Sequence, residues 1–560
     1  MIPINYQKRK NEELFKSFEG PKRLDLVNMQ NYIPIYKRFF LLNESTYNNI
    51  NLNHKWYLTS VNNKTSEISN VFNCKIKNIT TNKVKENQTF FKIAPLLDPY
   101  KYLIGKYNID DNLFNLPDHN DTMVHPKIND YNNSAYVDGF FVFLNSILVN
   151  EYQFLHGIDY YGSFLAIQHN FKIDVFEDIE HLNNSDFFNK NKNVLFHIDN
   201  YEHLFNEQNK LAPIHIDHNQ SAYSNISVHS FNDELFENIF EDQENGELVE
   251  VSKIIENGGI ENGFLNSQTV TVKSNSTCSS RSSHTSNESS IIESSVIESD
   301  SDSETEEKIN VTFDKFPVKV ICMEFCENTF DDLIMSNELS EDEWFSALMQ
   351  IIMILITFQK AFSFTHNDLH TNNVMYNYTK KKYLYYCYKN IHYKVPTFGR
   401  IFKIIDFGRS IYKCNGLLMC SDSFRNGEDA SSQYNTEPYF KESKPRLDPN
   451  FSFDICRLAC SIFDYLIDDL DEISDLSKCD PVKRLIVEWC LDDKGINLLY
   501  KNNGSDRYPD FKLYKMIARH VHKHTPQDQL LRPEFASFSK FKDTIPASEV
   551  INIDKIPIFV

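Results

Sequence analysis

The sequence is poor in basic residues for its acidic content. It carries 57 Lys and Arg against 78 Asp and Glu, which gives a formal net charge of -21 at pH 7. Proteins that bind nucleic acid or anionic membranes through charge need clustered Lys and Arg. We therefore expect neither nucleic acid nor a membrane surface among the partners of this chain.

Cysteine clusters with the spacing of a metal site or a disulfide framework are also missing. The 11 cysteines are scattered over 560 residues, and Cys456 and Cys460 stand at the i,i+4 spacing of one helix face. Thiols in such positions are typical of a buried core. This usage fits a reducing compartment, so we expect a cytoplasmic location.

A secretory signal and a convincing membrane span are not visible in the sequence. Residues 1–20 are charged and hold no apolar stretch of the kind a signal peptide needs. The most apolar segment, 344–364, is long enough to cross a bilayer, but Gln350, Gln359 and Lys360 interrupt it. We expect a buried helix over this segment.

Two polar loops carry the chemistry that the sequence offers. Residues 365–375 read Thr-His-Asn-Asp-Leu-His-Thr-Asn-Asn-Val-Met, and residues 403–408 read Lys-Ile-Ile-Asp-Phe-Gly. Phosphoryl transfer from a nucleotide needs one carboxylate to orient the attacking hydroxyl. It also needs an amide and a second carboxylate to hold magnesium on the phosphates. Asp368, Asn373 and Asp406 supply these groups.

Together the two loops resemble the catalytic loop and the Asp-Phe-Gly segment of the protein kinase superfamily. The resemblance implies that Asp368 is the catalytic base. It also implies that Asn373 and Asp406 hold Mg²⁺ on ATP. Either loop alone would be a weak motif, but the two occur in the family's order.

Residues 51–99 read as strands, and one of them carries a lone lysine. The apolar run 89–95 holds Lys92, which in most proteins would lie on a solvent face or extend its amine to water. Placed upstream of the two loops, Lys92 resembles the strand lysine that grips the α- and β-phosphates of ATP. The resemblance thus assigns Lys92 to ATP binding.

The loop that covers the phosphates in this family departs from its usual pattern here. Aligning Val71 with the family's ATP-contacting valine places Lys64, Ser66 and Ser69 where three glycines are expected. Glycine lets the backbone approach phosphate closely. We expect this loop to hold ATP less closely than the family's loop does.

Residues 133–154 predict a helix, because apolar residues recur at helical spacing. In the resembling family this helix carries an acidic residue that pairs with the strand lysine. Asp138 and Glu151 are both candidates for the partner of Lys92, and the sequence does not choose between them.

The strand 317–325 runs into a turn with the pattern of the family's hinge. The resemblance places Met323 beside the adenine pocket and assigns the backbone groups of Glu324 and Cys326 to the adenine edge. A helix over 341–362 is then expected to lead into the catalytic loop.

Further motifs of the family occur toward the C-terminus. Asp454 resembles the aspartate that anchors the catalytic loop, and Arg532 resembles the arginine that pairs with the glutamate of an Ala-Pro-Glu motif. That motif is missing, and Glu442 is the residue that stands in for its glutamate. The position before the catalytic aspartate is Asn367, where many kinases carry an arginine.

The resemblance predicts an α+β fold, the bilobal protein-kinase-like fold with a β-rich N-lobe and a mainly helical C-lobe. We divide the chain into an N-terminal extension (1–50), an N-lobe (51–325), a C-lobe (326–545) and a C-terminal tail (546–560). An insertion at about 171–311 interrupts the N-lobe. Its part 274–307 is serine-rich and acidic, and we expect it to be disordered because it can bury little apolar surface.

The sequence as a whole is similar to those of the serine/threonine protein kinases of large cytoplasmic DNA viruses. The similarity lies in the His-Asn-Asp-Leu-His loop at 366–370 and in the run 91–99. For a viral protein, the expected location is the host cytoplasm or the virion.

We therefore predict an ATP- and Mg²⁺-dependent kinase that transfers the γ-phosphoryl group to Ser or Thr hydroxyls of protein substrates. One alternative is a small-molecule kinase of the choline or aminoglycoside kind, whose loops are similar. The other is a pseudokinase scaffold, which the missing glycines favour.

Overall fold

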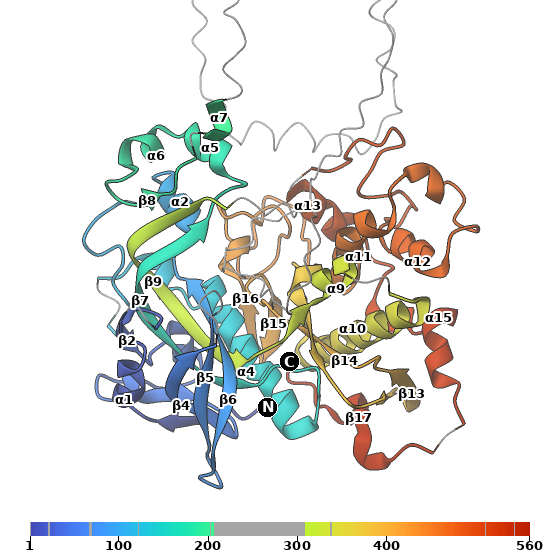
Figure 1. The fold of residues 1–560 in the computed structure, drawn as a ribbon, viewed down its shortest axis with the longest axis horizontal. Helices are drawn as coiled ribbons and strands as arrows, with labels where there is room; N and C mark the ends of the chain where they lie inside the picture. The colour runs from blue at the N-terminus through green and yellow to red at the C-terminus, as the bar shows by residue number, and fades with distance from the viewer. Residues whose placement is uncertain are drawn as a thin grey trace, which may run out of the picture. The chain divides into compact units, whose positions relative to one another are not determined.

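The computed structural model describes residues 2–20, 23–65, 70–120, 123–201, 203–206, 308–336, 339–509, 511–542 and 544–560. Ser66, Ser69 and the low-complexity segment 274–307 lie outside the described residues. In the described part, the chain is a mixed α and β protein. Its largest sheet is built from residues before 325, and most of its longer helices follow (Figure 1).

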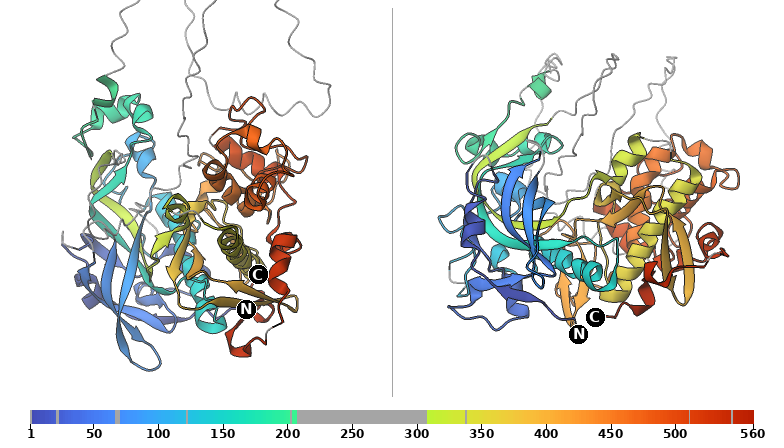
Figure 2. Two further views of the ribbon diagram at one scale, coloured as in Figure 1. Left: turned by 45° about the vertical axis from the view of Figure 1, so that its right-hand side comes forward. Right: turned by 60° about the horizontal axis from the view of Figure 1, so that its bottom comes forward.

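The largest sheet has seven antiparallel strands and curls around one side of the protein (Figures 1 and 2). Six strands follow the order β2-β7-β9-β6-β5-β4, and β8 pairs with the far end of β9. Their bounds are β2 Leu26–Gln30, β4 Trp56–Lys64, β5 Val71–Asn78, β6 Val84–Pro95, β7 Tyr160–Asp174, β8 His197–Ile198 and β9 Asn310–Glu324. The strands predicted within 51–99 are confirmed as β4, β5 and β6.

Strands β7 and β9 are the two longest and lie next to each other inside the sheet. Their pairing runs from Tyr160 opposite Met323 to Asp174 opposite Asn310. Regular pairing thus continues past both ends of the predicted insertion. Between the two strands, the described residues form α5 Ile179–Asn183, α6 Asp186–Asn191 and β8, and α7 His203–Asn206 belongs to a separate unit.

Helix α4, Ser134–Tyr152, lies against strands β7 and β9 of this sheet (Figure 2). The side chain of Asn133 caps its N-terminus by accepting a hydrogen bond from the amide of Ala135. Every residue from Ala135 to Leu148 is buried, so the helix is enclosed on all sides. It ends at Gln153, which adopts the left-handed conformation with φ 55°. The predicted helix over 133–154 is confirmed.

Helix α10, Glu341–Phe362, is the core helix of the second half of the chain. Ser340 and Glu343 form a capping box at its start. Its length and composition would allow it to cross a membrane, but 94% of its most apolar window is buried inside the protein. The prediction of a buried helix that leads into the polar loop at 365–375 is confirmed.

The remaining elements of the second half are shorter. The helices are α9 Phe330–Ser336, α11 Phe453–Leu466, α12 Pro481–Trp489, α13 Phe511–His520, α14 Pro526–Gln529 and α15 Pro533–Ala536. The strands are β10 Asn328–Thr329, β11 Val374–Tyr378, β12 Tyr383–Tyr388, β13 Ile391–Pro396, β14 Arg400–Ile404, β15 Ile411–Cys414, β16 Leu417–Cys420 and β17 Val550–Asn552. Nearer the N-terminus lie β1 Tyr6–Lys8, α1 Glu12–Lys16, β3 Ile50–Leu52, α2 Pro99–Leu103 and α3 Pro126–Asn129.

The small sheet β10-β11-β14 places the two polar loops side by side. Val374 of β11 pairs with Ile404 of β14, so the loop before β11 and the segment after β14 leave the sheet at the same end. The amide of Ile405 then donates to the carbonyl of Asn373 at 3.0 Å. Asn373 and Asp406 are brought together in this way.

Candidate active site

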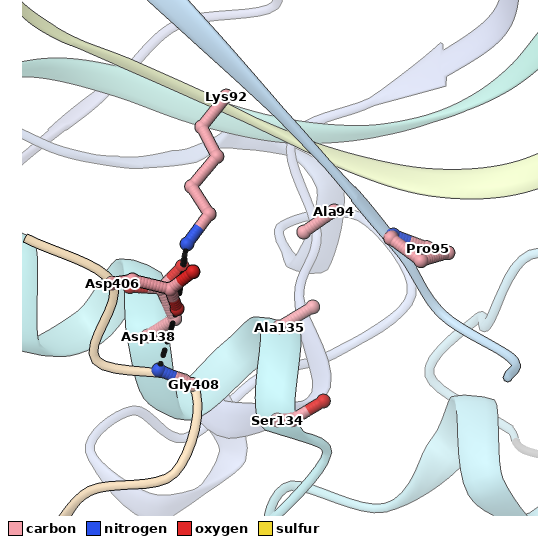
Figure 3. A pocket seen from close by; sticks show the side chains of 8 residues that line it. All are labelled: Lys92, Ala94, Pro95, Ser134, Ala135, Asp138, Asp406 and Gly408. Atoms are coloured by element: carbon pink, nitrogen blue, oxygen red, sulfur yellow. Dashed lines mark hydrogen bonds and ion pairs between the residues drawn. The ribbon is translucent and has the colours of Figure 1, made fainter. Parts of the chain in front are cut away.

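The centre of the candidate site is a buried lysine held by two carboxylates (Figure 3). Lys92 Nζ lies 2.7 Å from Asp138 Oδ2 and 2.9 Å from Asp406 Oδ1. Lys92 comes from β6, Asp138 from α4, and Asp406 from the segment after β14. Three parts of the chain that are far apart in sequence thus meet at one ammonium group.

The pKa of Lys92 is raised above its ordinary value by this arrangement. Burial by itself disfavours the charged amine, but the charges of Asp138 and Asp406 outweigh that effect. The pKa of Asp406 is lowered in turn, because the attraction of Lys92 exceeds the cost of burying its carboxylate. The ion pair therefore keeps both groups charged.

The partner of Lys92 is Asp138, which settles the choice that the sequence left open. Asp138 stands in the second turn of α4, and its side chain is 2% exposed. Glu151 stands at the other end of the helix and pairs with Lys55 at 3.7 Å, with more than half of each side chain exposed. Glu151 is therefore a surface residue.

Asp138 also fixes the segment that carries Asp406. Its Oδ1 accepts a hydrogen bond from the amide of Phe407 at 3.0 Å. Asp406 adopts a positive φ of 59°, and its Oδ1 accepts a weaker bond from the amide of Gly408 at 3.3 Å. A left-handed residue costs some backbone energy and needs support from its surroundings. Helix α4 provides that support and couples its own position to that of Asp406.

Helix α11 fixes the loop at 365–375 through hydrogen bonds to the backbone of the loop. Asp454, in the first turn of α11, accepts hydrogen bonds from the amides of His366 and Asn367, both at 2.9 Å. The expectation that Asp454 anchors this loop is therefore confirmed. Within the loop, Asn373 Nδ2 donates to the carbonyl of Asp368 at 2.9 Å.

Asp368 lies in a buried, strongly polar environment. Tyr514 donates its hydroxyl to Asp368 Oδ1 at 2.7 Å, and Arg409 Nε lies 3.8 Å from Oδ2. Burial alone would raise the pKa of Asp368, but the charges of Arg409, His370 and Arg457 lower it to about 2. The carboxylate is therefore ionised at neutral pH and able to accept a proton or a hydrogen bond.

The donor atoms near Asp406 fit a magnesium ion bound together with phosphate. Asn373 and Asp406 supply an amide oxygen and a carboxylate, which are ligand types that Mg²⁺ accepts. In the described part of the chain, no group of three or more His, Cys, Asp or Glu side chains is arranged to hold a metal. A magnesium ion at Asn373 and Asp406 would thus need phosphate oxygens and water to complete its shell.

The pocket next to Lys92 is small in this structure. It is lined by Lys92, Ala94, Pro95, Ser134, Ala135, Asp138, Asp406 and Gly408 (Figure 3). Its interior volume is about 10 Å³, which is close to the space of one water molecule. A nucleotide phosphate would need more room beside Lys92 than this volume provides.

The residues assigned to adenine lie on neighbouring strands of the large sheet. Val71 of β5 pairs with Phe90 of β6, and Phe90 pairs on its other side with Met323 of β9. The adjoining residue Glu324 ends β9, and its amide donates to the carbonyl of Asp159 at 2.8 Å. Val71 and the end of β9 are thus only two strands apart.

The turn after β9 holds Cys326 in a buried position. Burial raises the pKa of its thiol to about 12, so the side chain is a neutral packing group. The side chain of Glu324 is fixed by Lys403 at 3.1 Å and by Asn377 Nδ2 at 3.1 Å. The predicted hinge is therefore a firmly held turn between β9 and β10.

The predicted pairing of Arg532 with Glu442 is wrong. Arg532 forms a short ion pair with Glu488 of α12 and lies 3.9 Å from Glu534, while Glu442 is exposed. Arg532 precedes α15, beside α12, and spacing along the sequence does not reveal which helix an arginine will face. The missing Ala-Pro-Glu motif is thus not replaced by this pair.

Three residues of the site were not recognised in the sequence: Tyr514, Arg457 and Arg409. Arg457 carried a usable signal, because it is a charge that lies one helical turn after Asp454 among the apolar residues of α11. Tyr514 carried none, since a tyrosine in an amphipathic helix is usually a packing residue. Arg409 directly follows Asp-Phe-Gly, but its place in the sequence does not show that it lies near Asp368.

Comparison with known proteins gives partial likenesses. No protein-family model matches the chain. A serine/threonine-protein kinase haspin homolog of Drosophila melanogaster is 29% identical over 103 residues, which cover 18% of this chain and 18% of that protein. An uncharacterized protein, 098R, of Invertebrate iridescent virus 6 is 26% identical over 182 residues, which cover 31% of this chain and 26% of that protein. The likeness to a kinase is therefore weak and partial, and the matches span only a minor part of either relative.

Proposed function

We propose that the chain is an ATP- and Mg²⁺-dependent serine/threonine protein kinase with a bilobal, kinase-like fold. The single observation that supports this most is the buried cluster of Lys92, Asp138 and Asp406, which is tied to the loop that carries Asp368 and Asn373. The partial match to a serine/threonine-protein kinase supports the same function. Protein substrates and ATP would be its partners.

In this proposal Lys92 neutralises part of the triphosphate charge. Its ammonium is already held in place by Asp138, so little side-chain entropy is lost when it binds a phosphate oxygen. Asp406 and Asn373 would hold Mg²⁺, which neutralises the charge that develops on the phosphates during transfer. Asp406 would exchange Lys92 for the metal as the site opens.

Asp368 would orient the acceptor hydroxyl and accept its proton. Its low pKa makes it a weak base, so its main contribution is to align the hydroxyl with the phosphorus. The anchoring of the loop by Asp454 keeps this carboxylate in one position relative to Asp406. Positioning and electrostatics supply most of the acceleration in such reactions.

The experiment that tests this function is incubation with γ-labelled ATP and Mg²⁺, beside an acceptor panel of generic proteins, choline and an aminoglycoside. We expect label on serine and threonine of the proteins, and none with Asp406→Asn. Glu151→Gln is the matched control, because Glu151 is the other acidic residue of α4 that sequence allowed. Label on the small molecules alone would favour the small-molecule kinase and overturn the proposal.

A pseudokinase is the second candidate, and the small volume of the pocket beside Lys92 favours it. A pseudokinase would give no labelled product with any acceptor under conditions where the protein is folded. A thermal shift with ATP and Mg²⁺ separates the two cases: a shift without transfer indicates a nucleotide-binding scaffold. Transfer that is lost in Asp406→Asn excludes the scaffold.

A further inference from the structure

Two helices of the second half of the chain converge on the side chain of Asp368. Tyr514, on α13, donates its hydroxyl to Asp368 Oδ1 at 2.7 Å. Arg457, on α11, donates its Nε to the same tyrosine oxygen at 2.8 Å. All three side chains are buried, with residue exposures of 1–3%. The three groups form one hydrogen-bonded chain from α11 through α13 to the loop.

The direction of this chain follows from the chemistry of its members. A guanidinium has donors only, and an ionised carboxylate has acceptors only. The hydroxyl of Tyr514 must therefore accept from Arg457 and direct its single hydrogen at Asp368. Arg457 thus fixes the orientation of the hydroxyl, and the hydroxyl fixes one oxygen of Asp368.

Arg457 stands one helical turn after Asp454, so α11 contacts the loop at two levels. Asp454 holds the backbone of the loop through the amides of His366 and Asn367. Arg457 contacts the side chain of Asp368 indirectly, through the hydroxyl of Tyr514. A buried guanidinium is costly unless an opposite charge lies near, and the charge of Asp368 meets that need.

Helix α13 also influences the second carboxylate oxygen of Asp368, Oδ2, through its contact with Arg409. Phe511, one turn before Tyr514, lies under the guanidinium of Arg409, with 4.7 Å between the guanidinium carbon and the ring centroid. Arg409 Nε lies 3.8 Å from Asp368 Oδ2. The two aromatic residues of α13 therefore act on both oxygens, one directly and one through Arg409.

We propose that Tyr514, oriented by Arg457, is a positioning residue that fixes the carboxylate of Asp368 for alignment of the acceptor hydroxyl. This inference rests on the proposed kinase function. In-line transfer tolerates little misplacement of the group that holds the attacking oxygen. Removing the tyrosine hydroxyl leaves the carboxylate in place but removes the hydrogen bond that orients its Oδ1.

The test is steady-state kinetics of Tyr514→Phe, which deletes one oxygen and keeps the ring. We expect kcat to fall about tenfold or more, since a hydrogen bond to a charged group is lost. The KM for ATP should stay within about twofold, because Lys92 and Asp406 are untouched. Arg457→Lys should lower kcat in the same direction, and adding Tyr514→Phe to it should lower kcat little further.

Tyr386→Phe is the matched control. It deletes a buried tyrosine hydroxyl of β12 that bonds His156 at 2.7 Å and should leave kcat unchanged. An unchanged kcat in a folded Tyr514→Phe variant would overturn the inference. A higher kcat would also overturn it, since Tyr514 would then block the place of the acceptor hydroxyl.

A double-mutant cycle separates failure of this inference from failure of the proposed function. Melting temperatures of Tyr514→Phe, Asp368→Ala and the double variant do not depend on activity. We expect the double variant to melt higher than the sum of the two single shifts predicts, because both changes remove the same bond. Additive shifts would refute the pairing. The melting shifts could instead be coupled while the chain transfers no phosphate to any acceptor. That result would refute the kinase function and, with it, the positioning role of Tyr514.

Discussion

At the scale of single residues, charge balance decides which groups can lie inside the candidate site. Lys92 is buried with two carboxylates, and Asp138 satisfies both Lys92 and the amide of Phe407. Removing Asp138 would leave Lys92 with one partner and release the segment that carries Asp406. Glu151 has neither role, since it lies at the surface with Lys55.

We therefore expect Asp138→Asn to lower the rate of phosphoryl transfer by at least about tenfold and to lower the melting temperature. The physical reason is the loss of a buried ion pair, whose disruption is strongly destabilising. Glu151→Gln should change neither quantity. Parallel transfer assays and melts check this, and equal rates in the two variants would show that the buried pair is not needed.

Lys319 is a second buried lysine, and its surroundings differ sharply from those of Lys92. It lies on β9 and donates to the backbone carbonyl of Ala135 at 3.0 Å, at the start of α4. A Cβ atom on Gly139 would come within 2.2 Å of its ammonium nitrogen, so a larger residue there would require the lysine side chain to shift. Burial lowers the pKa of Lys319 to about 7.

This shift makes the stability of the protein depend on pH. The folded pKa of about 7 lies below the ordinary value of about 10.4. The unfolded chain therefore binds more protons between these values, and stability rises with pH across this window. We expect the stability that Lys319→Met gains over wild type to be about 2 kcal/mol smaller at pH 9 than at pH 7.

Denaturant unfolding of both proteins at several pH values measures that difference. Other titrating groups are shared by the two proteins and largely cancel in the difference. If the difference in the free energy of unfolding between the two proteins stayed constant from pH 7 to 9, Lys319 would have the same protonation in the folded and unfolded states.

The sequence predicted Lys92, Asp368, Asn373 and Asp406 as site residues, because the strand that carries Lys92 and the two polar loops follow the order of the family that they resemble. The structure brings Lys92 into contact with Asp406 and links Asn373 to both loops. The acidic partner of Lys92 could not be chosen, since that depends on which face of α4 meets the sheet. Tyr514 could not be found at all, because its role exists only where α13 meets the loop.

At the scale of elements, the residue before Asp368 is the neutral Asn367, and its side chain is held by neutral hydrogen-bonding groups. Asn367 Nδ2 donates to the carbonyl of Arg409 at 3.0 Å, and Asn367 Oδ1 accepts from the hydroxyl of Tyr434 at 2.8 Å. The two cations that could substitute for an arginine here are already in ion pairs. Arg409 lies near Asp368 and Asp429, and Arg425 pairs closely with Asp130.

We expect that transfer does not require phosphorylation of the segment after Asp406. A phosphate on Ser423 or Thr436 would find no arginine at position 367 to form a bidentate pair. Phosphatase-treated enzyme should therefore phosphorylate a generic substrate about as fast as untreated enzyme. A large loss of rate, reproduced by alanine at one of these hydroxyls, would contradict this expectation.

The positions of helices and strands along the chain were easier to predict than the side-chain contacts between them. The apolar periodicity of 133–154 predicted α4 to within two residues, and the apolar segment before the loop at 365–375 predicted α10. The segment 51–99, which was read as strands, contains β4, β5 and β6. The mispaired Arg532 shows the limit of that approach. A charged residue at a helix start can face several neighbours, and only the packing of α12 against α15 selects Glu488.

At the scale of the whole molecule, the last residues are part of the core. Strand β17 pairs with β12, and Ile551, Ile553 and Ile556 are buried. Lys360, at the end of α10, donates to the carbonyls of Ile553 at 2.5 Å and Ile556 at 2.8 Å. The segment treated as a C-terminal tail in the sequence thus holds the helix that leads into the loop at 365–375.

We expect Ile553→Ala to lower the free energy of unfolding by about 2–5 kcal/mol, because it leaves a cavity beneath α10. Ile558→Ala is the matched control: its side chain is 66% exposed, so the change should stay within about 0.5 kcal/mol. Urea unfolding measures both. Equal, small effects would show that the C-terminal segment is not packed as the structure has it.

Whether the buried Lys92 cluster holds ATP phosphates is tested most directly by calorimetric titration of MgATP into the full chain and into Lys92→Met. We expect the full chain to bind MgATP and Lys92→Met to bind it at least about tenfold more weakly, with Glu151→Gln unchanged. The reason is that Lys92 supplies the one ammonium that Asp138 and Asp406 hold at this site. Equal affinity in wild type and Lys92→Met, or no binding by a folded wild-type chain, would contradict the proposed function at its centre.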